Sequence, residues 1–146
     1  MKELLQKKLH EEIPLTKLMD FKIESYEEKR LVTKAPLEIN INDKGTAFGG
    51  SLSTITIISA WSMCWLISKE LGYDSKNIVV IKNENTYNKP VTKDIFCYTK
   101  KPNSDEIKLI DKKLKEKGSA SVKIVSNIIE DNNVCVSFEG IYVIKL

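Results

Sequence analysis

Residues 40–51 read Asn-Ile-Asn-Asp-Lys-Gly-Thr-Ala-Phe-Gly-Gly-Ser. A second segment of eighteen residues, from Ser51 to Ser68, begins where this one ends and carries no charged side chain. Apolar side chains occur on every side of a helix drawn through this second segment. A helix that is apolar all round is typical of a buried central helix. We therefore expect a core helix that ends at Glu70-Leu71-Gly72, where glycine supplies the usual stop.

Eighteen uncharged residues are also long enough to suggest a membrane span. Seven of the eighteen are Ser or Thr, however, and the flanking residues lack the usual anchoring features. No second segment of this kind is present. The sequence therefore favours a core helix and predicts no membrane span.

Three of the six glycines, Gly45, Gly49 and Gly50, stand directly ahead of this helix. Glycine lets a ligand come close to the main chain. The first amides of a helix have no intrahelical partner and lie at the positive end of its dipole. The segment therefore predicts a site for an anion or a polarised carbonyl oxygen. The alternative is a plain turn.

Elsewhere the hydrophobic pattern predicts a surrounding sheet. Alternating and apolar runs predict strands at 19–26, 31–35, 77–87, 94–100, 119–129 and 134–144, and helical spacing predicts helices at 4–12 and 103–117. A long antiparallel sheet that covers one central helix is an α+β arrangement. We expect one domain over residues 1–146, with the other face of the sheet towards water or a second subunit.

The overall composition is that of a soluble globular protein. The chain has 146 residues, of which 42% are hydrophobic and 29% charged, and its net charge is only +3. This balance does not indicate a nucleic-acid partner. The first residues contain no apolar stretch of the kind found in signal peptides, so a cytoplasmic location is the default expectation.

The three cysteines, Cys64, Cys97 and Cys135, are more than thirty residues apart and form no CxxC pair. We expect them to be small buried hydrophobic residues and expect neither a metal nor a cofactor. The one histidine, His10, is expected on the solvent side of the first helix. A mechanism that needs a histidine base is therefore nearly excluded.

The motif Asn-x-Asn-x-x-Gly-Thr-Ala-Phe-Gly-Gly-Ser resembles the hotdog thioesterase superfamily. Further matches lie along the chain at Trp61, Ile78-Val79-Val80, Tyr87, Pro90-Val91 and Asp94. More narrowly, the chain is similar to the bacterial thioesterase-like domain that is often fused to an N-terminal acetyltransferase. The similarity covers roughly residues 15–146.

This resemblance implies a homodimer, or a dimer of dimers, of six-stranded hotdog subunits that bind acyl-CoA or acyl-carrier-protein thioesters at the subunit interface. It also implies that the second glycine of the pair, Gly50, donates its N–H to the thioester carbonyl. Relatives often carry an acidic residue about two turns into the helix, where this chain has none between Thr54 and Ile58. They often carry histidine just before the glycine pair, where this chain has Phe48.

Hydrolysis of a thioester needs an oxyanion donor and an oriented water. The catalytic candidates are Gly50, Asn42, Asp43 and Ser51; the substrate-binding candidates are Asn40, Phe48, Gly49, Thr54, Asn83 and Tyr87. Asp43 is the only nearby carboxylate and hence the only local candidate for a general base, with a solvated turn residue as the alternative. Ser51 has no histidine to activate it, so we expect it to cap the helix instead.

Three further patterns remain open between two interpretations. Asn83, Asn85 and Tyr87 share one strand face, which we expect to continue Val79 and Ile81; these polar groups either reach the partner's glycine pair or lie at the surface. The aromatic and methionine side chains of the central helix are core residues or the wall of an acyl tunnel. The lysines of 108–117 form a solvated helix face, or they bind CoA phosphates or an acidic carrier protein.

The leading hypothesis is hydrolysis of an acyl thioester by a homodimer. The alternative is a non-catalytic module that binds acyl thioesters or fatty acids, and the missing acid and histidine motivate it. Hydration or dehydration of an acyl thioester would need an acid and base pair that the sequence does not offer.

Overall fold

The computed structural model describes residues 1–75 and 77–146. One antiparallel sheet runs through it in the order β1-β2-β4-β5-β6-β3. Its strands are β1 (Lys22–Tyr26), β2 (Arg30–Ala35), β3 (Asn77–Tyr87), β4 (Ile95–Lys100), β5 (Ser119–Glu130) and β6 (Asn133–Lys145). The helices are α1 (Lys2–Glu12), α2 (Pro14–Leu18), the short 3-10 helix η1 (Glu38–Asn40), α3 (Gly49–Glu70) and α4 (Ser104–Lys117).

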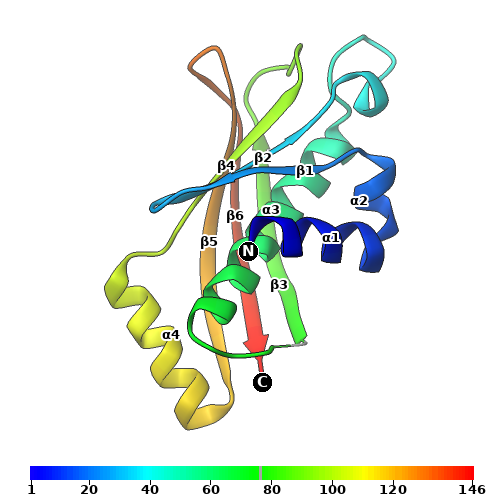
Figure 1. Ribbon diagram of the computed structural model, residues 1–146. Coiled ribbons are helices and arrows are strands. Elements are labelled where there is room, and N and C mark those ends of the chain that lie inside the picture. Colours follow the sequence, from blue (N-terminus) through cyan, green and yellow to red (C-terminus); the bar gives the residue numbers. More distant parts are fainter. Residues whose placement is uncertain (76) are drawn as a thin grey trace.

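The central helix α3 lies along the sheet, as Figure 1 shows, and the predicted α+β arrangement is confirmed. From Ser62 to Ser68 every side chain is buried. Within the described residues α3 is the one helix with the length and apolarity of a membrane span. Because most of it is buried against its own sheet, it is a core helix.

Strand β3 contains an irregularity that the alternating pattern does not reveal. Its register against β6 shifts between Val80 and Lys82, so that Ile81 is an extra residue in a β-bulge. A bulge moves the residues that follow it to the other face. Asn83, Asn85 and Tyr87 therefore share the inner face with Ile78 and Val80. The expectation that they continue Val79 and Ile81 was wrong.

The N-terminal helices are fastened to the beginning of β1. His10 Nε2 lies 2.7 Å from the carbonyl oxygen of Phe21 and 2.8 Å from Gln6 Nε2. The expectation that His10 only faces solvent was therefore wrong, because its ring is half-buried and bonded to the backbone ahead of β1. The sequence also gave no sign of α2, which Pro14 starts in the position where proline fits best.

A layer of small hydroxyl side chains separates the middle of α3 from the sheet. Thr33 Oγ1 lies 2.7 Å from Ser59 Oγ, and Thr99 Oγ1 lies 2.7 Å from Ser126 Oγ. All four residues have no exposed surface. Cys97 lies among them and is buried, as are Cys64 and Cys135, which confirms the expectation for the three thiols.

Candidate functional site at the start of the central helix

The helix α3 begins with three backbone amides that point out of its N-terminus. Phe48 is the N-cap and supplies no side-chain hydrogen bond. Ser51 is the third residue of the helix, so the expectation that it caps the helix was wrong. In the described chain no hydrogen bond uses the amides of Gly49, Gly50 or Ser51, whereas Leu52 N already donates to Phe48 O. The helix therefore presents unpaired donors at its positive end.

The ring of Phe48 lies beside these amides. A β-carbon added to Gly50 would meet the Cζ atom of this ring at 2.9 Å and its Cδ2 atom at 3.1 Å. The same addition at Gly49 would meet nothing within 4 Å. Phe48 itself is 55% exposed. A side chain at Gly49 would thus enter open space, while the aromatic ring of Phe48 lies on the Gly50 side.

Asn42 holds the loop that leads into the helix. Its Oδ1 accepts hydrogen bonds from Lys44 N at 2.7 Å and Thr46 N at 3.1 Å. Its Nδ2 donates to Thr46 Oγ1 at 2.8 Å and to Ala47 O at 3.3 Å. Every polar atom of this side chain is therefore used within its own turn, which is a common role for asparagine.

Asn40 is also used for structure. It is 3% exposed, and its Nδ2 donates to Met19 O at 3.0 Å and Pro36 O at 2.8 Å. Its own carbonyl oxygen accepts from Phe48 N at 2.8 Å. Asn40 therefore joins the end of α2 to the residue that caps α3, and it does not point into the open space.

Asp43 lies in the solvated part of the same turn. Its carboxylate is paired with Lys44 Nζ at 3.0 Å, and its side chain is 81% exposed. Thr54, one turn into α3, donates its hydroxyl hydrogen to Gly50 O at 2.9 Å. The structure thus brings Gly49, Gly50, Ser51, Thr54 and Phe48 together, while Asp43 stands apart from them in water.

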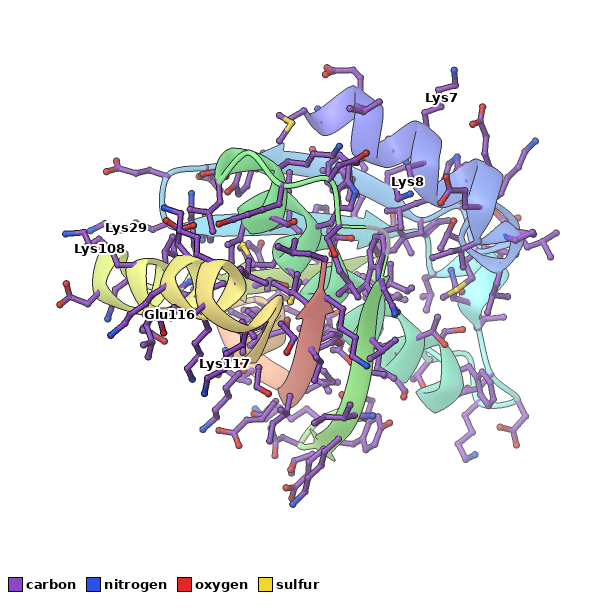
Figure 2. All side chains as sticks on the ribbon, turned by 90° about the horizontal axis from the view of Figure 1, so that it is seen from below. Lys7, Lys8, Lys29, Lys108, Glu116 and Lys117 are labelled. Carbon is purple, nitrogen blue, oxygen red and sulfur yellow. The ribbon has the colours of Figure 1, made fainter. Side chains whose placement is uncertain are left out.

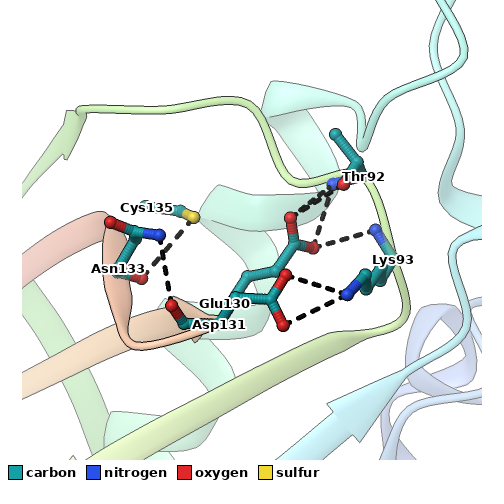
Figure 3. A network of polar contacts seen from close by, with 6 residues as sticks. All are labelled: Thr92, Lys93, Glu130, Asp131, Asn133 and Cys135. Carbon is teal, nitrogen blue, oxygen red and sulfur yellow. Dashed lines mark hydrogen bonds and ion pairs between the residues drawn. The ribbon is translucent and has the colours of Figure 1, made fainter.

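A second loop fixes the position of the first. Ala47 N donates to Val91 O at 2.8 Å, immediately before the helix start. The neighbouring residues Thr92 and Lys93 donate their amides to the Glu130 carboxylate at 2.9 to 3.2 Å, and Thr92 Oγ1 donates at 2.8 Å. Figure 3 shows this network at the turn between β5 and β6. The β5–β6 turn therefore holds the 88–94 loop, and this loop in turn holds the residue ahead of the helix start.

Sequence reasoning missed a polar contact between the central helix and β3. Thr56 Oγ1 lies 2.9 Å from Asn85 Oδ1 and 2.9 Å from Ser53 O. Thr56 is fully buried and Asn85 is half-buried. Asn83 and Tyr87 lie on the same face and are exposed, with no hydrogen bond from either side chain in the described chain. The shared face of 83, 85 and 87 was the available signal, but nothing in the sequence pairs it with Thr56.

The lysines of α4 are far from this site. Figure 1 places α4 at the opposite end of the sheet from the start of α3, and Figure 2 shows Lys108, Glu116 and Lys117 projecting from its outer side. Lys115 is paired with Asp111 at 3.0 Å. This position is the one expected of a solvated helix face.

One cavity of the described chain also lies away from the glycine pair. It measures about 540 Å³, between α1 and the C-terminal end of α3, and is lined by Leu4, Lys8, Trp65, Lys69 and five further polar residues. Its ammonium and carboxylate groups pair with each other, as in Lys8–Glu12 and Lys69–Asp74. None of the residues at the helix start lines it, so the site rests on the amides of α3 and not on this hollow.

No group of His, Cys, Asp and Glu side chains among the described residues has the arrangement of a metal site. The helix start itself offers backbone N–H donors, hydroxyls and amides. Such groups stabilise a developing negative charge on oxygen and orient a water molecule.

Solved structures share this fold over nearly their whole length. A protein of unknown function from Chlorobaculum tepidum is 31% identical with a TM-score of 0.95, and the match covers 99% of this chain and 93% of that chain. A "putative thioesterase" from Shewanella oneidensis is 28% identical with a TM-score of 0.87, covering 99% and 97%. A thioesterase from Haemophilus influenzae, at 13% identity and a TM-score of 0.71 over 100% and 92%, is similar in fold alone.

The family model described as "Putative thioesterase (yiiD_Cterm)" matches residues 2–146. This range contains the glycine pair, the central helix and all six strands. The hotdog fold implied by the resemblance is thereby confirmed. The chain belongs to this thioesterase family of hotdog-fold proteins.

Proposed function

We propose that the protein hydrolyses acyl thioesters of coenzyme A or of an acyl carrier protein, with Gly50 N–H as the oxyanion donor. One observation carries this proposal: the unpaired amides of Gly49 and Gly50 at the positive end of a buried helix. A preorganised backbone donor of this kind is worth about 3–4 kcal/mol of transition-state stabilisation. The family membership supports a thioester as the substrate.

The acyl group would lie on the apolar surface next to the glycine pair. Ile57, Ile58 and Trp61 of α3 are only partly buried. Phe48 and Tyr87 are more than half exposed. We propose that these side chains form the apolar surface beside the polar helix end that an acyl chain with a carbonyl head requires.

We propose that two copies cover this surface as a homodimer. Strand β3 pairs with β6 on one side only and forms one edge of the sheet. An open edge strand presents unpaired backbone groups that a second strand can satisfy. On β3, Val79 is 40% and Ile81 is 60% exposed. A two-fold axis beside β3 would join the two sheets and bury these side chains.

Sedimentation analysis of the Ile81→Asp variant tests the dimer. We expect the unaltered protein to sediment as a dimer and Ile81→Asp as a monomer, because the substitution places a carboxylate in an apolar interface. Ser121→Asp is the matched control, since Ser121 is an exposed residue of β5, which β6 separates from the β3 edge. An unaltered protein that stays monomeric at all concentrations would refute this part of the proposal.

A non-catalytic acyl-thioester binding module is the second candidate function. It is favoured by the position of Asp43, the one carboxylate close in sequence to the glycine pair, which faces solvent and Lys44. The two functions are separated by a titration with a non-hydrolysable acyl-CoA analogue beside a thiol-release assay. Saturable binding without thiol release supports the binding module, and thiol release supports the hydrolase.

A further inference from the structure

The contact between Thr56 and Asn85 contains more acceptors than donors. A hydroxyl group has one hydrogen. Thr56 Oγ1 nevertheless lies 2.9 Å from two oxygens, Ser53 O and Asn85 Oδ1. Thr56 can donate to only one of them, and its hydroxyl is fully buried, so an unmatched lone pair there is costly.

Turning the Asn85 amide about its last bond resolves this conflict. The amide nitrogen then faces Thr56 and donates to Oγ1, while Thr56 donates to Ser53 O. In this arrangement the Thr56 hydroxyl both donates, to Ser53 O, and accepts, from the Asn85 amide nitrogen. As a result, the oxygen of Asn85 turns away from Thr56. Within the described chain the Asn85 side chain has no hydrogen bond other than the one to Thr56.

The free oxygen lies on the face of β3 that carries the other polar side chains. Asn83, Asn85 and Tyr87 share the inner face after the bulge, and both neighbours of Asn85 on this face are exposed. Thr56 lies less than two turns of α3 after Gly50. The same helix thus supplies the amide donor at its start and, through Thr56, the anchor for an acceptor on the adjacent strand.

We infer that the buried Thr56 hydroxyl holds the Asn85 amide so that its oxygen accepts a hydrogen bond from the water that attacks the thioester. This inference rests on the proposed hydrolase function. Asn85 is then a catalytic residue that touches the reacting water, and Thr56 is a positioning residue that acts through it.

The reaction balances without a protein base. The water oxygen forms a bond to the carbonyl carbon and the carbon–sulfur bond breaks, its electron pair remaining on sulfur. An amide oxygen cannot remove a proton at neutral pH, so the water gives its proton to solvent, and the thiolate takes one from solvent. The products are a carboxylic acid and a free thiol. Asn85 orients the attacking water, and Gly50 N–H stabilises the oxyanion.

Substitutions at both positions test the inference by thiol release. We expect Asn85→Ala to lower kcat about 100-fold and Thr56→Val about tenfold with KM nearly unchanged, because misplacing a reacting group by an ångström costs rates of that order. Thr56→Ser should restore the rate. Thr86→Val on the outer face of β3 is the matched control.

The Asn85→Asp variant distinguishes an acceptor from a donor. It keeps an acceptor oxygen, and Thr56 can turn its hydroxyl hydrogen from Ser53 O to the carboxylate, which lies equally near. We therefore expect activity to survive and its pH–rate profile to gain an acidic limb near the ordinary Asp pKa of about 3.9. If the NH₂ group of Asn85 served the oxyanion instead, Asn85→Asp would be as inactive as Asn85→Ala. That result would overturn the inference.

The orientation of the amide is measurable without activity. Side-chain amide exchange by NMR should show one Asn85 hydrogen slowed relative to Asn83, and Thr56→Val should remove the difference. Equal exchange at Asn83 and Asn85 overturns the inference. If Asn85→Ala leaves the turnover unchanged, the inference is overturned and the proposed function is not affected. If the unaltered protein turns over no thioester, the proposed function is refuted and, with it, the catalytic role of Asn85.

Discussion

The ring of Phe48 lies against the α-carbon of Gly50. A β-carbon at position 50 would stand 2.9 Å from Cζ of the ring, closer than real β-carbons come to their neighbours. One residue earlier, at Gly49, a β-carbon would enter open space. The two glycines of the pair therefore have different surroundings: a side chain at position 50 would displace the Phe48 ring, whereas a side chain at position 49 would enter open space.

Gly50→Ala should separate activity from stability. Alanine suits a helix better than glycine by about 1 kcal/mol, which offsets the cost of moving the flexible Phe48 ring. We therefore expect the free energy of unfolding to change little. Displacement of the ring beside the oxyanion donor should lower thiol release about tenfold or more.

The matched variant for stability is Gly49→Ala, which should raise the free energy of unfolding by up to about 1 kcal/mol because its methyl group meets nothing. In the double variant Phe48→Ala/Gly50→Ala the ring is absent, so its free energy of unfolding should not include the cost of displacing the ring. Full thiol release by Gly50→Ala would show that the contact between Phe48 and Gly50 has no part in the reaction.

The strands and the two long helices could be predicted from the sequence because their causes are local. The range of β3, Asn77–Tyr87, was predicted as observed, and α3 ends before Gly72 as expected. The face of 83, 85 and 87 was predicted correctly, but the residues that continue it were not. A single extra residue at Ile81 reverses the alternation, and an alternating pattern contains no mark for it.

Glu130→Ala should weaken the hydrogen bond from Ala47 N to Val91 O, although Glu130 does not contact Ala47. The Glu130 carboxylate accepts from the amides of Thr92 and Lys93, next to the Val91 carbonyl that receives Ala47 N. We expect faster hydrogen exchange at the Ala47 amide and a loss of about 1 kcal/mol in the free energy of unfolding.

Asp131→Asn is the control for Glu130. The ion pair between Asp131 and Lys93 joins side chains that are 65% and 62% exposed. Exposed pairs contribute less than about 1 kcal/mol, so we expect Asp131→Asn to leave Ala47 exchange unchanged. Equal exchange at Ala47 in the unaltered protein and in Glu130→Ala would contradict the connection through the 88–94 loop.

The buried pair of Thr33 and Ser59 should show strong coupling. Thr33→Val leaves the Ser59 hydroxyl buried without its partner, and we expect a loss of about 1–3 kcal/mol in the free energy of unfolding; Ser59→Ala acts in the same way on Thr33. The double variant should cost less than the sum of the two, since it removes both hydroxyl groups. Denaturant unfolding of all four proteins measures the coupling, and strict additivity would contradict a direct hydrogen bond.

The three thiols should be unreactive in the folded protein. Burial raises the pKa of Cys97 to about 11, and burial raises the pKa of Cys64 and Cys135 above the ordinary value as well. A raised pKa lowers the fraction of reactive thiolate. An aromatic disulfide reagent at pH 8 should therefore detect three thiols only after unfolding. Rapid labelling of Cys97 in the native protein would show that the layer around it opens.

The side chains of the candidate site could be predicted less well than the backbone. Gly49 and Gly50 were found because their chemistry is that of a helix start, which the sequence marks directly. Asn40 and Asn42 were expected near substrate, but their amides are used by Met19, Pro36 and the turn at 44–47. Residues brought together by folding, such as Thr56 and Asn85, leave no local trace in the sequence.

Release of free thiol from a panel of acyl-CoA and acyl-carrier-protein thioesters of increasing chain length tests the central claim most directly. The native thiols do not interfere if they are unreactive as predicted. The proposed function predicts turnover of at least one thioester, with a rate that falls in Gly50→Ala and in Asn85→Ala. No thiol release from any member of the panel would contradict it.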